Sequence, residues 1–304
     1  MVPALSGAGL AAAPDRRITE LTHSPMTPRP PIPPEMKREI RQRCGFGCVI
    51  CGMPLYEYEH MLEWAEVRRH IAEEITLLCR QHHGEKTNRL LPKEVVAAAN
   101  RNPYNKQTGV SKQHLLHYSG QTVRLRIADS CFEYNNLPDG AFFAPLVIDG
   151  LPLVGFRVEQ GELLLHFIAF NELNKPIVQI VDNELIYDAT QWDIEWIAQT
   201  LTIREGRGRI LLRLVFSPPS EISVLKGRLL RNGIELLVGR NYLFNTNNSN
   251  FFGAISTVNC PIGFAIGDPT PNVGAGIVMS GISRYNFERR QAREFLRRCL
   301  NRRR

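Results

Sequence analysis

The sequence has no long hydrophobic run and little that would direct it to a membrane or out of the cell. No uninterrupted apolar stretch of this 304-residue chain approaches the roughly 20 residues that a membrane-spanning helix needs. Its opening, MVPALSGAGLAAAP, lacks both the basic start and the long apolar segment of a signal peptide. We therefore expect no membrane partner and a cytoplasmic location.

Most of the chain also carries little net charge. The formal charge is +7, and the segment from Arg284 to Arg304, with nine arginines and two glutamates, carries +7 by itself. The remainder is therefore close to neutral. We predict a basic C-terminal helix over residues 281–304, whose charges are either simply solvated or contact the phosphates of nucleic acid.

The seven cysteines, three of them crowded between Cys44 and Cys51, do not form the pattern of a secreted disulfide framework, and three of the seven belong to a metal-ligand pattern. Cys48-x-x-Cys51 and Cys79-x-x-His82 are two pairs, each spaced so that a tight turn aims two side chains at one ion. The 27 residues between the pairs are enough for a hairpin. We predict a structural Zn²⁺ site on these four residues; a redox pair and unrelated buried cysteines are the alternatives. Cys44 is a competing ligand that would break the pairing.

Changes in residue composition and hydrophobic pattern along the sequence divide the chain into parts. Residues 1–34 hold eight of the 20 prolines and are expected to be a disordered leader, with Pro34 opening a short helix that stops at Gly45. Residues 35–105 form a compact unit with the Cys and His residues, followed by a linker-like stretch at 100–109. From 111 to 280, short alternating runs separated by turn sequences predict a β-rich domain, a sandwich or alternatively a solenoid. The fold class is therefore α+β.

Three stretches of the compact unit, CGFGCVICG, YEHM and EEITLLCRQHHGEKT, resemble the HNH endonucleases of the zinc-stapled ββα-metal kind. The resemblance covers about residues 36–95, under a quarter of the chain. It places the acidic residue of the motif at Glu59, its first His at His60 and its final His at His83. Glu74 stands where that family has Asn, with Glu73 the candidate if the register shifts by one, and His82 stands where a fourth cysteine is common.

The resemblance implies a metal-dependent endonuclease. Hydrolysis of a phosphodiester needs an activated water and an ion that stabilises charge on the phosphate. His60 would be the general base, and Glu59, Glu74 and His83 would hold a catalytic Mg²⁺ or Mn²⁺. DNA is the expected substrate, although the residues do not distinguish it from RNA. The alternative is a catalytically inactive zinc-stabilised module that binds nucleic acid or protein.

Other charged and aromatic residues lie close to these motifs or in the β-rich part. Nucleic-acid contacts are predicted at Lys86, Arg89 and Lys93, with solvated helix charges as the alternative. His114 and His117, three apart on what could be a helix, receive no role, and Trp192 and Trp196 are expected in the core of the β-rich domain. That domain could select the target or mediate association with a protein partner or a second copy of the chain.

Overall fold

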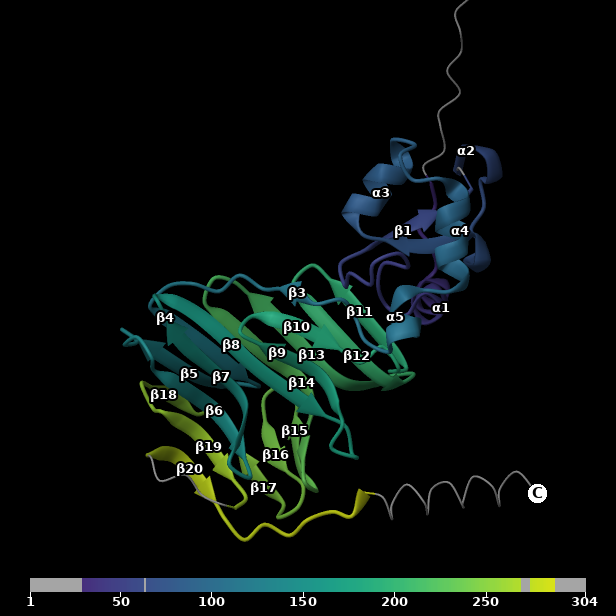
Figure 1. The fold of residues 1–304 in the computed structure, drawn as a ribbon. Coiled ribbons are helices and arrows are strands. Elements are labelled where there is room, and N and C mark those ends of the chain that lie inside the picture. The colour runs from purple at the N-terminus through teal and green to yellow at the C-terminus, as the bar shows by residue number, and fades with distance from the viewer. Residues whose placement is uncertain (1–28, 63, 269–273, 288–304) are drawn as a thin grey trace, which may run out of the picture. The chain divides into compact units, whose positions relative to one another are not determined.

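The computed structural model describes residues 29–62, 64–268 and 274–287 (Figure 1). Contacts group the chain into two compact units, residues 1–31 and residues 32–304. Most of the predicted leader and the basic part of the predicted C-terminal helix lie outside the described residues. Within them, no helix is both long and apolar enough to cross a membrane.

The N-terminal part of the larger unit is small and mixed in structure (Figure 1). Its strands β1 and β2 pair antiparallel, with Glu57 opposite Leu78 and His60 opposite Ile75. The elements in this part are α1 (Pro34–Cys44), β1 (Glu57–His60), α2 (Trp64–Val67), the 3₁₀ helix η1 (Ala72–Glu74), β2 (Ile75–Leu78), α3 (Arg80–Thr87), α4 (Lys93–Arg101) and α5 (Tyr104–Thr108).

Helix α1 begins and ends where its sequence predicts. Pro34 occupies the first turn, where a missing N–H costs no hydrogen bond. Gly45 ends the helix in the left-handed conformation, with φ of 70°, and its N–H donates to the carbonyl of Arg41. The stretch predicted as a linker, in contrast, is largely helical: it contains the end of α4 and all of α5. The buried Asn105 of α5 donates to the carbonyl of Gly45 at 2.9 Å, so this stretch packs against the end of α1.

The rest of the described chain is mostly β-structure, as predicted, in two large sheets. The first has the order β20-β19-β6-β7-β8-β9-β10-β3. Its strands are β3 (His114–Leu115), β6 (Phe142–Ile148), β7 (Leu151–Glu159), β8 (Glu162–Phe170), β9 (Pro176–Val181), β10 (Glu184–Tyr187), β19 (Ile262–Ile266) and β20 (Ala275–Met279). His114 thus lies in a strand rather than in the helix that its spacing suggested.

The second sheet runs β11-β12-β13-β14-β15-β16-β17, and β4, β5 and β18 join it through β14. Its strands are β4 (Thr122–Ile127), β5 (Ser130–Asn135), β11 (Asp193–Ile197), β12 (Thr200–Gly206), β13 (Arg209–Ser217), β14 (Glu221–Arg231), β15 (Ile234–Val238), β16 (Leu243–Asn245), β17 (Asn250–Phe252) and β18 (Ser256–Val258).

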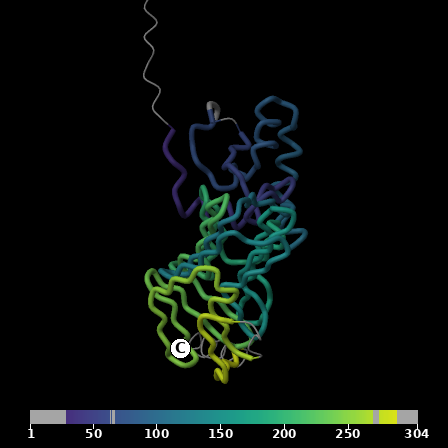
Figure 2. The backbone as a smooth tube through the Cα atoms, turned by 90° about the vertical axis from the view of Figure 1, so that its left-hand side faces the viewer, coloured from purple at the N-terminus to yellow at the C-terminus, as the bar shows by residue number. Residues whose placement is uncertain are grey.

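One hydrophobic core lies between the two sheets. Strand β4 shows the alternation that builds it, because Val123, Leu125 and Ile127 are buried while the residues between them are exposed. Side chains from both sheets, including Phe156 of the first and Leu212 of the second, belong to the same buried cluster. Most neighbouring strands are antiparallel, which is the pattern of a sandwich, since the coils of a solenoid pair in parallel. Figure 2 shows the course of the backbone from a second direction, turned by 90° from Figure 1.

Candidate metal centre and neighbouring acid–histidine pair

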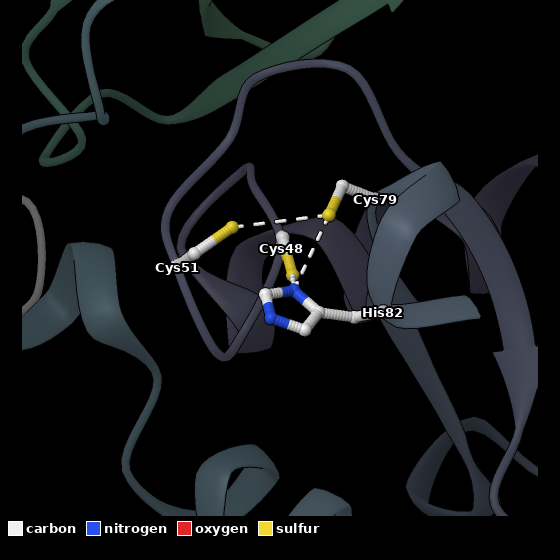
Figure 3. A group of neighbouring side chains, drawn as sticks. All are labelled: Cys48, Cys51, Cys79 and His82. Carbon is white, nitrogen blue, oxygen red and sulfur yellow. Dashed lines mark hydrogen bonds between the residues drawn. The ribbon is translucent and has the colours of Figure 1, made fainter. Parts of the chain in front are cut away.

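The four predicted zinc ligands converge on one point (Figure 3). Cys48 and Cys51 lie in the turn after α1, Cys79 immediately precedes α3, and His82 lies in the first turn of that helix. Their ligand atoms all lie within 4.8 Å of one another. The His82 Nδ1 atom is 3.3 Å from the Sγ atoms of both Cys48 and Cys79, and the Sγ atoms of Cys51 and Cys79 are 3.8 Å apart.

These distances fit a tetrahedral zinc ion. With Zn–S bonds of about 2.3 Å and a Zn–N bond of about 2.0 Å, tetrahedral geometry separates two sulfurs by about 3.8 Å and a sulfur from a nitrogen by about 3.5 Å. The backbone supports the turn: Gly52, with φ of 74°, donates its N–H to the carbonyl of Cys48 at 2.8 Å. The competing residue Cys44 lies outside the group and contacts Thr76 and Asn100 instead.

The two cysteines of the first pair have unequal proton affinities. The hydrogen bond between them raises the pKa of Cys48 to about 12, with burial acting in the same direction. The same hydrogen bond lowers the pKa of Cys51 against the opposing effect of burial. Binding of a metal ion by these two side chains would release the protons of their thiols.

Next to this centre, β1, β2 and α3 bring an acid and a histidine together. Glu59 is on β1 and His83 is on α3, and the Oε2 atom of Glu59 lies 2.9 Å from the Nε2 atom of His83. The other carboxylate oxygen of Glu59 accepts a hydrogen bond from the Lys86 ammonium at 2.5 Å. Glu57, two residues earlier on the same strand, lies 3.8 Å from Nδ1 of His83. The predicted pair therefore exists, with a lysine beside it.

His60 points to different neighbours. It is only 4% exposed, and its Nε2 atom shares a hydrogen bond of 3.2 Å with Nδ1 of His70. The ring of Trp64 packs against both imidazoles, with centroid distances of 5.3 Å to His60 and 4.8 Å to His70. The predicted base is thus oriented by a second histidine and an indole.

The structure does not bring Glu74 to the Glu59–His83 pair. One oxygen of Glu74 accepts a hydrogen bond from Arg69 at 2.9 Å, and its other oxygen is buried without a hydrogen-bond partner among the described residues. Among those residues, the only group of three or more ligand atoms that meets the geometry of a metal site is the Cys₃His quartet. Glu59 and His83 are therefore a contacting pair and do not belong to a metal-ligand group of this kind.

The predicted nucleic-acid contacts differ in exposure. Arg89 and Lys93 are exposed, as a contact with phosphate requires. Lys86 is 7% exposed and forms an ion pair with Glu59. It is therefore neither a solvated charge nor in a position to contact phosphate. Its ammonium instead neutralises the carboxylate of Glu59 inside the candidate site.

Sequence reasoning missed two residues of this site, His70 and Trp64. His70 lies in VRRHIAEE, where nothing in its spacing from His60 shows that the chain between the strands folds back. The contact of Lys86 with the site could have been predicted, because Lys86 follows His83 by three residues and so lies on the same side of the helix.

Comparison of the chain with protein-family models, with curated proteins and with solved structures finds no match in any of the three. The site is therefore defined by its own geometry: a Cys₃His centre suited to a structural metal, beside an acid–histidine pair.

Proposed function

We propose that this protein is a metal-dependent endonuclease that hydrolyses phosphodiester bonds in nucleic acid, with DNA the expected substrate. The observation that carries the proposal is the contact of Glu59 with His83 in a strand–strand–helix unit that the zinc centre closes. This is the arrangement that the resemblance to HNH endonucleases implies. The four-ligand centre has no open position for water, so its role is structural.

In this proposal Glu59 and His83 hold a divalent ion, Mg²⁺ or Mn²⁺, that stabilises negative charge on the phosphate when it is bound. The Lys86 ammonium then gives up its contact with Glu59. His60 accepts the proton of the attacking water. His70, which is bonded to it, fixes the orientation of the His60 ring and offers a route for the proton toward solvent.

A second candidate function is a catalytically inactive zinc-stabilised module that binds nucleic acid or a protein partner. It is favoured by the pairing of the site residues with one another: Lys86 already neutralises Glu59, and Arg69 pairs with Glu74. The β-rich domain would then supply association with the partner or with a second copy of the chain.

Cleavage by the purified full chain distinguishes the two functions. Plasmid and single-stranded DNA are incubated with Mg²⁺, Mn²⁺ or a chelator, and we expect cutting only with an added ion. His60→Ala should lower the rate about 10²- to 10⁴-fold, because it removes the proton acceptor. Zinc content should match that of the parent protein, and circular dichroism should show that the variant, which loses a buried ring and is therefore less stable, is still folded at the assay temperature.

Two further variants serve as controls. His117→Ala removes an exposed histidine outside the site and should cut like the parent. Glu74→Gln should also retain activity, because that side chain faces Arg69 rather than Glu59 and His83. Cleavage that persists in His60→Ala would refute the assignment of the base, and a parent protein that binds DNA without cutting it under any ion would establish the second function.

A further inference from the structure

A cleft of about 790 Å³ opens beside the metal centre, which is within the usual size range of ligand sites. Residues of the small N-terminal part form one wall: the ligands Cys51, Cys79 and His82, with Tyr56, Glu57 and Arg80. Residues of the β-rich part form the other wall: Lys112, His114 and Trp196. The cleft therefore exists only because the two parts of the chain pack together.

The indole of Trp196 is held in a fixed position at this cleft. Its N–H donates to the carbonyl of Ala198 at 2.8 Å, and its ring packs on Phe216 with a centroid distance of 5.3 Å. The ring of His114 meets it edge-on at 5.5 Å. Trp196 packs against the core of the β-rich part, where it was expected, but it is only partly buried and also lines the cleft. A preorganised aromatic ring of this kind is suited to stacking with a planar base.

Two cations stand at the same cleft. The Arg80 side chain is 95% exposed, and its nearest carboxylate, that of Glu57, is 3.7 Å away. Lys112 is exposed, and its ammonium makes no ion pair with any residue that the structure describes. An aromatic surface flanked by a guanidinium and an ammonium matches the base and the phosphates of a nucleotide.

The cleft adjoins the acid–histidine pair through Glu57. Glu57 lines the cleft and also lies 3.8 Å from His83. Because Glu57 and Glu59 are two residues apart on one strand, their side chains are on the same face. A nucleotide chain bound in the cleft would therefore lead toward Glu59 and His83.

The geometry points to a binding subsite for an unpaired nucleotide of single-stranded nucleic acid, in which Trp196 stacks with the base and Arg80 and Lys112 contact the flanking phosphates. The β-rich domain thereby provides a wall of the substrate site. Only the choice of nucleic acid as the ligand rests on the proposed function, and the binding itself needs no cleavage.

The test is fluorescence polarisation of a fluorescein-labelled single-stranded oligothymidylate with the full zinc-loaded chain, without added Mg²⁺ or Mn²⁺. The parent should bind, and Trp196→Leu should weaken binding about tenfold. Lys112→Ala and Arg80→Ala should each weaken binding and reduce the slope of log K against log salt by about 0.7. Both are exposed positions, so these two variants test the subsite even if Trp196→Leu folds poorly. Lys175→Ala, an exposed lysine outside the cleft, should bind like the parent.

The outcomes separate the subsite from the nuclease. A parent that does not bind, or Lys112 and Arg80 variants with unchanged affinity and salt slope, would overturn the subsite whether or not the protein cuts DNA. Binding that depends on these residues, in a protein that never cuts, would support the subsite and refute the nuclease.

Discussion

At the residue scale, the charge balance around Glu59 decides how readily the candidate site takes an ion. The Glu59 carboxylate is shared between His83 and Lys86. The ammonium of Lys86 is nearly buried, so it neutralises the carboxylate with little screening by solvent. A divalent cation that binds Glu59 must therefore compete with a positive charge that the chain itself supplies.

Replacing Lys86 with methionine should strengthen the binding of Mn²⁺ at Glu59 and His83. The substitution keeps most of the length of the side chain and removes the competing charge, so we expect a gain of about 1 kcal/mol or more, or roughly fivefold in affinity. Mn²⁺ titration followed by electron paramagnetic resonance measures it. Lys93→Met, the same change at an exposed lysine, should leave the affinity unchanged, and equal or weaker binding by Lys86→Met would contradict the charge argument.

At the element scale, the candidate metal centre brings together side chains from three segments of the small N-terminal part. It connects the turn after α1 to the end of β2 and to the first turn of α3. The paired strands β1 and β2 are only four residues each, and the apolar cluster of this part is small. We therefore expect this small core to depend on a bound metal for its stability.

Removal of zinc should therefore unfold residues 36–95 while the sheets of the β-rich part remain. Metal analysis of the purified protein should give about one zinc per chain. After chelation, or in Cys79→Ser, amide hydrogen exchange should become fast in β1, β2 and α3 and stay slow in β7, β8 and β13. Cys131→Ser, at a cysteine outside the centre, is the matched control. Slow exchange in β1, β2 and α3 of a metal-free protein would show that the metal centre is not needed to keep this part folded.

At the scale of the whole molecule, a buried network of charges ties the small N-terminal part to the β-rich part. Arg41 of α1 donates two hydrogen bonds of 2.9 Å to Asp193 of β11 and one of 2.8 Å to Glu195. Arg204 bonds to the same two carboxylates, so two cations balance two anions. Burial opposes the charge of Arg41, yet its pKa is raised because Asp193 stabilises the cation. Contacts therefore group residues 32–304 as one unit, and the predicted domain boundary falls inside it.

Arg41→Ala should lower the free energy of unfolding by roughly 3 kcal/mol, because it leaves the Asp193 carboxylate, whose side chain is 1% exposed, without its bidentate partner. Chemical denaturation measures the loss. Arg207→Ala breaks another ion pair between α1 and the β-rich part, the one with Glu35, but both of its side chains are highly exposed. Its stability should stay close to that of the parent. Similar losses in the two variants would show that burial of the pair is not what matters.

The sequence by itself determined the features that depend on short spacing along the chain. The two x-x steps of the metal ligands, the proline and glycine that bound α1, and the alternation of strands such as β4 all follow from local backbone geometry. The resemblance further placed Glu59 and His83 in one site, where the structure has them in contact.

Only the tertiary structure decided which distant groups share the sites. The partners of Glu59, His60 and Glu74 depend on how the chain between β1 and β2 folds back and how α3 lies on the strands. The position of Trp196 opposite the zinc ligands depends on the packing of β11 against the small N-terminal part. Periodicity tells which face of an element is buried, but not which element covers it, because that choice is made by the fit of surfaces that lie far apart in the sequence.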